Sequence, residues 1–591
     1  MIYEYDANGC TKDAVRIYKE NKAKIGDIES ATMKIIEEEP VLTLYDVCGE
    51  GIRIVSGLTS GYGGEGPHGL IWVLRDAGFQ IDEQFIYENE TFHIKRRELF
   101  MDMKWNKLLT EKRLIIEEKE PEAFNDYYIS PFERDFEKIV SSAAFRRLQD
   151  KTQVFPLAKS DFVRTRLTHS IEVSTIAKQL GIMCFQNTSS FQHPLIDKDE
   201  KDDGKLKRAG DIEAILSCAG LLHDLGNPPF GHIGEEIIRE WFKNNLANWS
   251  ITQKDNSKKM VSEILTEKQM KDLVNFEGNA QAFRILAKAR YQSEINLPFS
   301  IISALMKYPT RCDEMDENNK IRKKLGCYQA EKDVFVEIAN EVGTITPDGK
   351  VIRHPLAYLV EAADDIAYVT ADLEDAVKAG IVGVDELLQF FRRKCEPLRE
   401  ELKDTCMHME YTNDLINKLD LLNQNEQNET KVMNQWSTYV RKWLMYTTCW
   451  RFSRSYDSIL QGTYEHDLFH DNNHSLTVKL LKKAMEEFVF DSRVITEPEV
   501  AAQNILGGLL DKFVPALAKY DGYGIMTAKD KKIITLVSSR YIDDYKSAKE
   551  KDNITDESEL LYHRILIATD FISGMTDGYA KMLYKKIYGL D

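Results

Sequence analysis

LLHDLGNPPFGHIGEE, residues 221–236, joins the end of an apolar helix to a rigid turn. Apolar residues upstream recur at helical spacing, and the helix they predict ends at the adjacent pair His223 and Asp224. Gly226 and the Asn-Pro-Pro that follows then break the helix. Adjacent side chains in mid-helix point about 100° apart, whereas at a helix end both can reach one point. The pair is therefore a candidate for binding a metal ion, beside the simpler interpretation of a buried histidine held by its neighbour.

Two further segments carry residues that can complete such a site. Residues 165–181 place His169 on an amphipathic helix, and residues 355–377 form an alanine-rich apolar helix. The second helix contains Asp364 and Asp365, and carboxylates in so apolar a segment need a partner such as a cation. Two histidines and two aspartates offer nitrogen and oxygen ligands without thiolate, which suits Mn²⁺, Mg²⁺, Fe²⁺, Co²⁺ or Ni²⁺. We therefore expect a divalent metal ion that activates water and neutralises phosphate oxygens.

The overall composition is that of a globular chain with an acidic balance. Its 591 residues include 78 Lys or Arg and 96 Asp or Glu, for a formal net charge of −18. This balance excludes a basic surface over the whole chain, of the kind that binds DNA or anionic membranes without specificity. Apolar runs are shorter than the ~18 residues of a membrane span, and the start lacks a signal-peptide pattern. We expect a cytoplasmic protein with no membrane partner.

The hydrophobic patterns divide the chain into a small part and a large part. We predict a mainly α protein, with a small N-terminal α/β extension over residues 1–105 and an all-α core over residues 106–591, where 3.6-residue repeats dominate. Polar runs, including residues 198–208 and 313–320, are expected to be surface loops. Within the extension, the patterns indicate a helix at 13–38, strands at 41–47 and 52–55, a helix at 69–78 and a hairpin at 84–94.

Several ordered segments are much more specific than the His-Asp pair alone. They are residues 130–157, 165–170, 223–236, 275–286, 305–309, 361–377 and 570–589. Together they resemble the HD-domain deoxynucleoside triphosphate triphosphohydrolases, specifically the bacterial dGTPase-like branch. The resemblance covers about 105–591 and leaves the extension, whose role is unknown, unmatched. It implies an all-α HD-domain phosphohydrolase fold, and hydrolysis of a deoxynucleoside triphosphate, preferably dGTP, to the deoxynucleoside and inorganic triphosphate.

The metal ligands that the resemblance implies are carried over position by position. The family's D-x-x-x-Y-x-x-x-D pattern selects Asp364 over its neighbour Asp365. Tyr368 and Asp372 complete that pattern, and they share a helix face with Asp364 at intervals of four residues. The implied ligands are His169, His223, Asp224 and Asp364.

The resemblance also implies catalytic and substrate-binding residues. His232 matches the family's catalytic histidine, and Glu235 matches the carboxylate that orients it. An acid in a first helical turn is also favoured by the helix dipole, so Glu235 has a structural alternative. The basic substrate residues likewise have the alternative of solvated surface charges. The implied contacts are Gln153 and Asp372 with the sugar 3′-hydroxyl, Tyr368 with the sugar face, Arg166 with the phosphates or base, and Lys307 and Tyr308 with the triphosphate tail.

Two other functions stay open at this point. The first is an HD site that acts on another nucleotide phosphate ester, and the second is a catalytically silent regulator that senses nucleotides. Relatives form tetramers or hexamers, and some respond to nucleotides or single-stranded DNA. The resemblance therefore implies a homo-oligomer with a nucleotide or single-stranded DNA effector.

Two other motifs are weaker candidates for binding sites. Residues 465–474 contain the pairs His466-Asp467 and His470-Asp471 in a polar, asparagine-rich setting, which favours a surface role over a metal site. Residues 61–66 match G-x-G-x-x-G, but a clear following strand is missing. A turn or partner-contact loop is the preferred interpretation of those glycines.

Overall fold

The structure is a computed structural model in which the chain divides into two compact units, Met1–Phe100 and Met101–Asp591. The described residues are 2–25, 28–46, 50–62, 64–77, 79, 81, 83–95, 103–115, 130–155, 164–190, 202–291, 295–346, 348–401, 406–470, 472–490 and 492–590.

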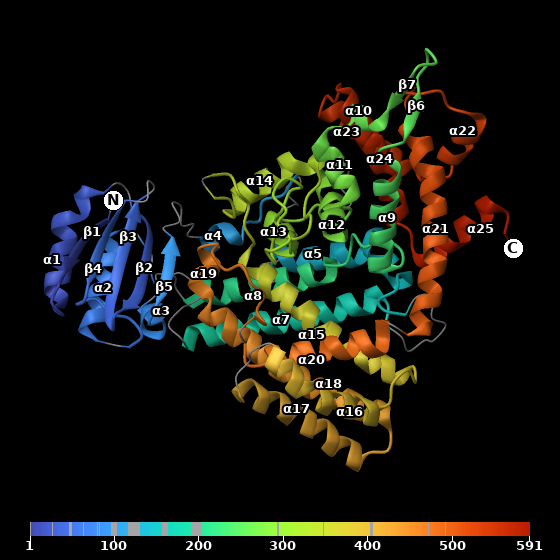
Figure 1. The fold of residues 1–591 in the computed structure, drawn as a ribbon. Helices are drawn as coiled ribbons and strands as arrows, with labels where there is room; N and C mark the ends of the chain where they lie inside the picture. The colour runs from blue at the N-terminus through green and yellow to red at the C-terminus, as the bar shows by residue number, and fades with distance from the viewer. Residues whose placement is uncertain are drawn as a thin grey trace. The chain divides into compact units, whose positions relative to one another are not determined.

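The first unit is a five-stranded sheet with helices, in strand order β1-β4-β3-β2-β5 (Figure 1). β1 and β4 run parallel, whereas the other neighbouring strands are antiparallel. The elements are β1 Ile2–Asp6, α1 Thr11–Asn21, β2 Ile28–Ile36, β3 Glu39–Asp46, β4 Gly51–Val55, α2 Glu65–Asp76, α3 Glu83–Glu88 and β5 Phe92–Lys95.

Two details of this unit differ from the sequence prediction. The predicted helix at 13–38 ends at Asn21, and Ile28–Ile36 is instead the strand β2. β2 bonds to β3 on one side and to β5 on the other, so long-range pairing outweighs the local helical pattern. The first half of the predicted hairpin at 84–94 is the helix α3.

The second unit is almost entirely helical, as Figure 1 shows. The mainly α class with a small α/β extension is therefore confirmed. One predicted loop is wrong in part, because the helix α8 begins at Asp202, inside the polar run 198–208. The elements are α4 Trp105–Leu108, α5 Pro131–Ser141, α6 Ala143–Arg146, α7 Arg166–Ser190, α8 Asp202–Leu222, α9 Gly231–Asn245, β6 Ser250–Thr252, β7 Lys258–Met260, α10 Val261–Ile264, α11 Glu267–Val274, α12 Gly278–Ala287, α13 Phe299–Leu305, α14 Lys332–Val342, α15 Pro355–Lys378, α16 Val384–Glu401, α17 Cys406–Asn425, α18 Glu429–Arg454, α19 Tyr456–Leu460, α20 Ser475–Met485, α21 Arg493–Ala518, α22 Ala528–Ile534, α23 Ser539–Lys551, α24 Glu557–Ser573 and α25 Asp577–Tyr588.

The helices that carry the candidate residues lie in the core of the second unit. α7 packs along α8, and α15 packs against both. Val173, Leu216 and Ala363, one from each helix, are fully buried in the same hydrophobic cluster. Gly220 permits the close approach of α8 to α7, since a Cβ there would lie 2.6 Å from the Cα of Ser174. This packing brings the first turn of α7, the end of α8 and the middle of α15 together.

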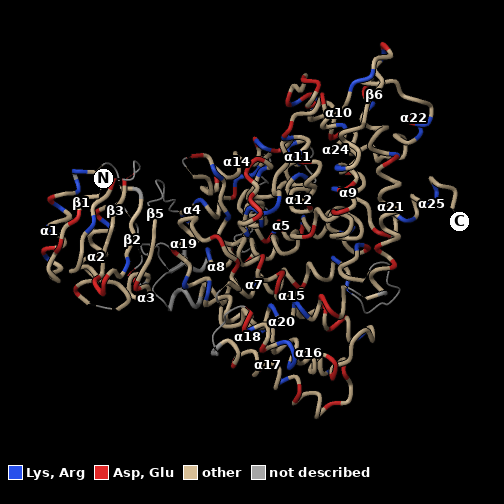
Figure 2. The backbone as a smooth tube through the Cα atoms, in the orientation of Figure 1, with Lys and Arg blue, Asp and Glu red and all other residues tan. Residues whose placement is uncertain are grey.

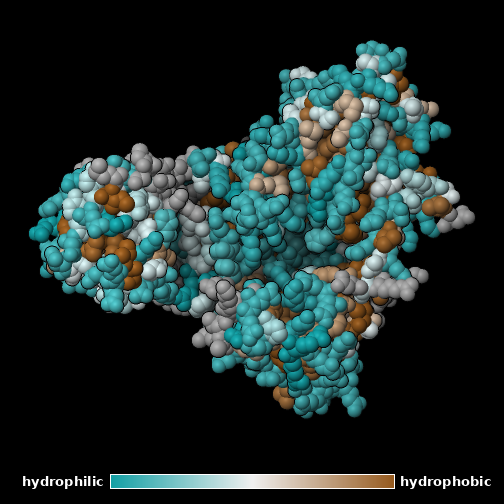
Figure 3. Space-filling model, viewed as in Figure 1, coloured by the Kyte–Doolittle hydropathy of each residue, from teal (hydrophilic) through white to brown (hydrophobic). Residues whose placement is uncertain are grey.

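The surface carries charges of both signs. Acidic and basic residues are interspersed along the helices (Figure 2). The face in view is mostly hydrophilic, with hydrophobic side chains in small separate patches (Figure 3). Across the described ranges, the helices lack the combination of length and apolar character that crossing a membrane requires.

Candidate active site

A cavity of about 250 Å³ lies where α7, α8, α9 and α15 meet. All the predicted site residues line it except Glu235, which lies behind His232, and Asp372. The cavity lining includes Gln153, Arg166, His169, His223, Asp224, Asn227, His232, Glu277, Lys307, Tyr308, Lys324, Glu361, Asp364, Asp365 and Tyr368.

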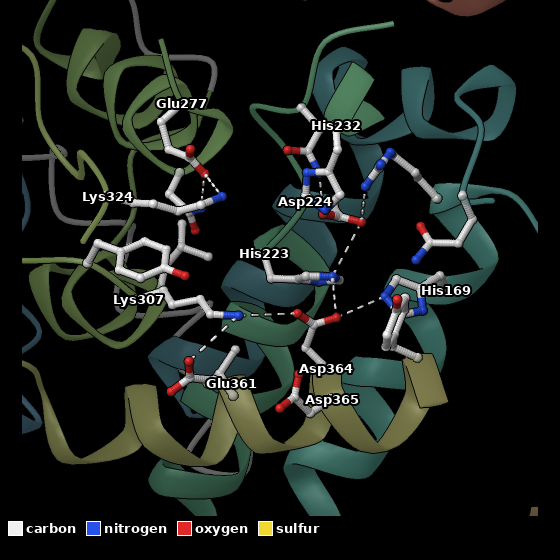
Figure 4. A pocket seen from close by; sticks show the side chains of 18 of the residues that line it. His169, His223, Asp224, His232, Glu277, Lys307, Lys324, Glu361, Asp364 and Asp365 are labelled. Carbon is white, nitrogen blue, oxygen red and sulfur yellow. Dashed lines mark hydrogen bonds and ion pairs between the residues drawn. The ribbon is translucent and has the colours of Figure 1, made fainter. Parts of the chain in front are cut away.

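Three of the four predicted metal ligands converge on one point of the cavity wall. The Nε2 atom of His169 lies 3.1 Å from Oδ1 of Asp364, and Nε2 of His223 lies 3.6 Å from the same oxygen. One potential ligand atom from each of the three residues lies within 4.8 Å of the others. Figure 4 shows Asp364 between the two histidines, which point toward it from α7 and the end of α8. This group can hold a metal ion.

The hydrogen bonding of His223 fits a metal ligand. Its Nδ1 lies 2.8 Å from the carbonyl oxygen of Gly220, so Nδ1 carries the hydrogen and Nε2 faces the carboxylates. Within the part of the chain that the structure describes, that buried Nε2 has no hydrogen-bond partner. A neutral imidazole nitrogen, oriented by a backbone carbonyl through its other nitrogen, is a common ligand of divalent metal ions. The residues present therefore fit a divalent cation.

Asp224, the fourth predicted ligand, lies beside this group but has other partners as well. Its Oδ2 accepts a hydrogen bond of 2.7 Å from Arg166 and lies 3.4 Å from Nε2 of His223. Its Oδ1 accepts a hydrogen bond from the side chain of Asn227. Arg166, predicted to contact the phosphates or base, thus contacts a carboxylate of the site. The ligand role of Asp224 stays a prediction.

The two neighbouring aspartates of α15 have different partners. Oδ2 of Asp365 accepts a hydrogen bond of 3.1 Å from Lys482 on α20, whereas Oδ1 of Asp364 faces the two histidines. Figure 4 shows Asp365 on the side of the helix away from His223. These contacts support the choice of Asp364 over Asp365 as a ligand.

The carboxylates control the protonation of His223. Burial disfavours the charged imidazolium, but the negative charges of Asp224 and Asp364 outweigh burial and raise the pKa of His223 to about 9. Burial likewise opposes ionisation of Asp364, but His223, His169 and Lys307 together outweigh burial and hold the pKa of Asp364 below its usual value. A cation that binds here must therefore displace a proton from His223.

We expect metal affinity to rise with pH for this reason. With the pKa of His223 near 9, the protonated form dominates at neutral pH, so affinity should increase by about tenfold per pH unit until that pKa is reached. Calorimetric titration with Mn²⁺ in buffers of different ionisation enthalpy should detect one released proton. Asp365→Asn, a change outside the cluster, should keep the same slope. Affinity independent of pH between about 6 and 8 would contradict this assignment.

His232 is accessible from the cavity and is held by a buried acid. Its side chain is 81% exposed, and its Nδ1 lies 3.0 Å from Oε2 of the buried Glu235. The other oxygen of Glu235 accepts a hydrogen bond of 2.7 Å from the backbone N–H of Gly278. Burial opposes ionisation of Glu235, but the contacts with His232, the charge of Lys324 and the hydrogen bond from Gly278 together outweigh burial and hold the pKa of Glu235 below its usual value. Glu235 is thus an anion that orients the ring of His232.

The predicted sugar contacts include two buried oxygens without partners. Oε1 of Gln153 and Oδ2 of Asp372 accept no hydrogen bond from the described residues. Gln153 lines the cavity, whereas Asp372 lies one helical turn beyond Tyr368 on α15 and is 1% exposed. Burial raises the pKa of Asp372, which favours its protonated form. The role of both residues in binding the 3′-hydroxyl stays a prediction.

The predicted phosphate contact Lys307 is flanked by carboxylates. Its Nζ lies 3.7 Å from Glu361 and 3.7 Å from Oδ2 of Asp364. Burial disfavours the charge of Lys307, but the negative groups around it, Glu361 above all, together outweigh burial and raise the pKa of Lys307. Lys307 is therefore a fixed positive charge beside the metal-binding group, and Tyr308 lies next to it on the cavity wall.

A second lysine of the cavity was not predicted from the sequence. Lys324 lies 3.1 Å from Glu277, and its Nζ is 6.0 Å from the centre of the Tyr308 ring. Lys324 follows the polar run 313–320. The sequence there has no hydrophobic period, so nothing distinguishes this lysine from a solvated lysine in a loop. Glu277 belongs to a segment matched to the family, but no role was assigned to it.

The weaker motifs do not form sites in the described parts of the chain. The rings of His466 and His470 stack 3.8 Å apart, and Asp467 pairs with Lys320, while Asp471 lies outside the described residues. Among described residues, the one group that can hold a metal is that of His169, His223 and Asp364.

The glycine-rich motif at 61–66 has a local structural explanation. Gly61 has a positive φ of 89°, which favours glycine, and a Cβ at Gly66 would lie 2.2 Å from Oγ1 of Thr59. Gly63 lies outside the described residues.

Comparison with known proteins identifies the family. An HD domain family model matches residues 166–277. The chain is 43% identical over 496 residues, 83% of its length, to the whole of a deoxyguanosinetriphosphate triphosphohydrolase-like protein of Listeria innocua. A protein of the same name from Synechocystis sp. is 31% identical over 499 residues, 83% of this chain and 100% of its own. A deoxyguanosinetriphosphate triphosphohydrolase of Serratia proteamaculans is 29% identical over 505 residues, 79% of this chain and 95% of its own. The chain therefore belongs to the deoxyguanosinetriphosphate triphosphohydrolase-like family of HD-domain proteins.

Proposed function

We propose that this protein is a metal-dependent deoxynucleoside triphosphate triphosphohydrolase with dGTP as its preferred substrate. The observation that carries the proposal is the group of His169, His223 and Asp364 on the wall of a cavity that also contains His232 and Lys307. Such a cavity combines a metal site, a proton donor and positive charge, as hydrolysis of a polyphosphate requires. The printed names of the relatives support dGTP as the substrate.

The metal ion would be held by the two histidines and the carboxylates. His169, His223 and Asp364 are the proposed ligands, with Asp224 as the fourth, and the nitrogen and oxygen donors suit Mn²⁺, Mg²⁺, Fe²⁺, Co²⁺ or Ni²⁺. When bound, the cation supplies a Lewis acid that lowers the pKa of water and neutralises phosphate oxygens.

We assign the proton transfer to His232. In the proposed reaction a water oxygen bonds to the α-phosphorus, and the bond from that phosphorus to the sugar 5′-oxygen breaks. The departing oxygen needs a proton, which His232 can donate while Glu235 holds the ring through Nδ1. The water oxygen stays on the released triphosphate, and the proton that the water loses replaces the one His232 donates, so the products are the deoxynucleoside and inorganic triphosphate.

The remaining residues of the cavity bind the substrate. Lys307 and Lys324 are the proposed counter-charges for the triphosphate tail, with Tyr308 between them as a hydrogen-bond donor. Both lysines pair with carboxylates, so binding of a polyanion exchanges one anionic partner for another. Gln153 and Tyr368 are the proposed contacts of the sugar.

Product analysis tests this function directly. The purified protein is incubated with each deoxynucleoside triphosphate and Mn²⁺ or Mg²⁺, and the products are separated by anion-exchange chromatography. We expect deoxyguanosine and intact inorganic triphosphate from dGTP. Monophosphate or pyrophosphate would instead indicate an HD site that acts on a different phosphate bond. Nucleotide binding without any product would indicate a silent regulator.

The sugar pocket should discriminate against ribonucleotides. Tyr368 lines the cavity, and a 2′-hydroxyl packed against its ring would be buried without a partner, at a cost of about 1 to 3 kcal/mol. GTP should therefore be a poor substrate. Tyr368→Ala opens that space, so the ratio of kcat/KM for dGTP to that for GTP should narrow while both rates fall. An unchanged ratio would contradict the assignment of Tyr368.

A further inference from the structure

The loop between α24 and α25 contacts two parts of the cavity wall that lie far away in the sequence. Asp577, the first residue of α25, is 2% exposed. Its Oδ1 accepts a hydrogen bond of 2.9 Å from the backbone N–H of Phe230. Its Oδ2 accepts one of 3.0 Å from the backbone N–H of Thr152 and another from the hydroxyl of Thr152. The carboxylate of Asp577 therefore links two segments of the chain that lie 347 and 425 residues before it in the sequence.

Both segments carry a functional residue immediately beyond the contact. Gln153, whose Oε1 is buried without a partner among the described residues, follows Thr152. His232 lies two residues after Phe230, in the first turn of α9. Asp577 itself does not belong to the cavity lining and contacts neither side chain in the described structure.

The turn before α9 contains a residue in a strained backbone conformation. Phe230 has a φ of 64°, in the left-handed region that a bulky residue rarely adopts, and Gly231 has a φ of 61°. α9 starts at Gly231, so the conformation of this turn decides where His232 points. The hydrogen bond to Asp577 is a charge-assisted bond that holds the N–H of the strained residue.

A second buried contact strengthens the same connection. The ammonium of Lys151 is 3% exposed and donates hydrogen bonds to the carbonyl oxygens of Asn227, at 2.5 Å, and of Ser573, at 2.8 Å. Ser573 ends α24, and Asn227 lies in the turn that follows Asp224. The loop from Ser573 to Asp577 is thus connected to both ends of the turn before α9, directly at Phe230 and through Lys151 at Asn227.

We propose that Asp577 is a positioning residue that holds Gln153 and His232 in register across the cavity. The inference rests on the proposed function, because it assumes that these two side chains act on one substrate. Asp577 acts through the backbone of Thr152 and Phe230, and a 1 Å error in such positions is enough to cost about 10²-fold in rate.

Asp577→Asn tests the proposal with little change in shape. The amide keeps one acceptor oxygen, so it can accept from the backbone N–H of Thr152 or of Phe230 but not from both. We expect kcat for dGTP to fall by about tenfold or more at unchanged metal content. Asp544→Asn is the matched control, since Asp544 is buried on α23 and pairs with Lys288 at 3.4 Å, away from the cavity. It should lower Tm and leave kcat and KM unchanged well below Tm.

Thr152→Val removes only the hydroxyl contact and leaves the bond to Phe230. It should raise KM by about threefold or more with kcat nearly unchanged, because Gln153 is displaced while His232 is not. Thr152→Ser should restore the wild-type KM. If Asp577→Asn does not fold, the comparison of Thr152→Val with Thr152→Ser tests the proposal instead. An unchanged KM in Thr152→Val then overturns it.

Amide hydrogen exchange tests the two backbone hydrogen bonds of Asp577 without measuring enzyme activity. The amides of Phe230 and Thr152 should exchange faster in Asp577→Asn than in the wild type, and not in Asp544→Asn. Wild-type kinetics and exchange in Asp577→Asn, or an equal loss of kcat in Asp544→Asn, would overturn the positioning role. An inactive wild type with the expected exchange pattern would refute the proposed function and keep the structural link.

Discussion

Asp364→Asn should reduce dGTP hydrolysis by about 10³-fold or more and remove most of the bound metal ion. Oδ1 of Asp364 lies 3.1 Å from Nε2 of His169 and 3.6 Å from Nε2 of His223, so both histidines face this oxygen. An amide has nearly the same shape but lacks the negative charge that a divalent cation requires from its ligands. Asp364→Asn therefore removes a negative charge from the centre of the metal-binding group, and side-chain packing should change little.

Asp365→Asn is the matched control, because it changes the same chemical group on the same helix. Asp365 bonds to Lys482 at 3.1 Å and faces away from the histidines, so its loss should cost about tenfold or less and keep the metal. Metal content is measured by mass spectrometry of the desalted proteins, and kcat/KM is measured with dGTP. If Asp365→Asn lost more metal and activity than Asp364→Asn, the ligand would be the other aspartate.

Local sequence patterns predicted the helices whose apolar residues recur at helical spacing. α8 and α15 follow apolar repeats whose residues are buried, and the break at Gly226 follows from glycine and proline chemistry. In α7 the apolar repeat matches the buried face only in part, because Ile176 and Leu180 are buried whereas Ile171 is 49% exposed. The strand Ile28–Ile36 was missed because its partners, β3 and β5, decide its conformation through pairing that no local window contains. The start of α8 was missed because a charged run can be a solvated helix as well as a loop.

The candidate site could be predicted to the extent that its residues belong to specific motifs. The predicted helix end places His223 at the site. The close packing of α8 on α7 at Gly220 explains why His169 lies beside His223. Lys324 was not found because it lies in a loop, where no period distinguishes a cavity lysine from a solvated one. Asp577 belongs to a matched segment, but its function depends on hydrogen bonds to residues 347 and 425 positions away. Such contacts are properties of the folded chain and have no local pattern.

His232→Ala should lower kcat by about 10²-fold or more while the metal content stays normal. His232 lines the cavity with a side chain that is 81% exposed, whereas the metal-binding group is formed by other residues, so removal of the ring takes away a proton donor and no ligand. The rate is measured at saturating dGTP and the metal content by mass spectrometry. Loss of metal in this variant would mean that His232 is itself a ligand, and the assignment of the proton transfer would fail.

Glu235→Gln separates the orientation of His232 from its chemistry. The amide can still bond to Nδ1 of His232 at the observed distance of 3.0 Å, and the bond from Gly278 can remain, so the ring keeps its place. What is lost is the buried negative charge beside the ring. We therefore expect a smaller fall in kcat than in His232→Ala. If Glu235 only stabilised the first turn of α9, Glu235→Gln would lower Tm and leave kcat unchanged, because the helix dipole acts on stability and not on the orientation of His232.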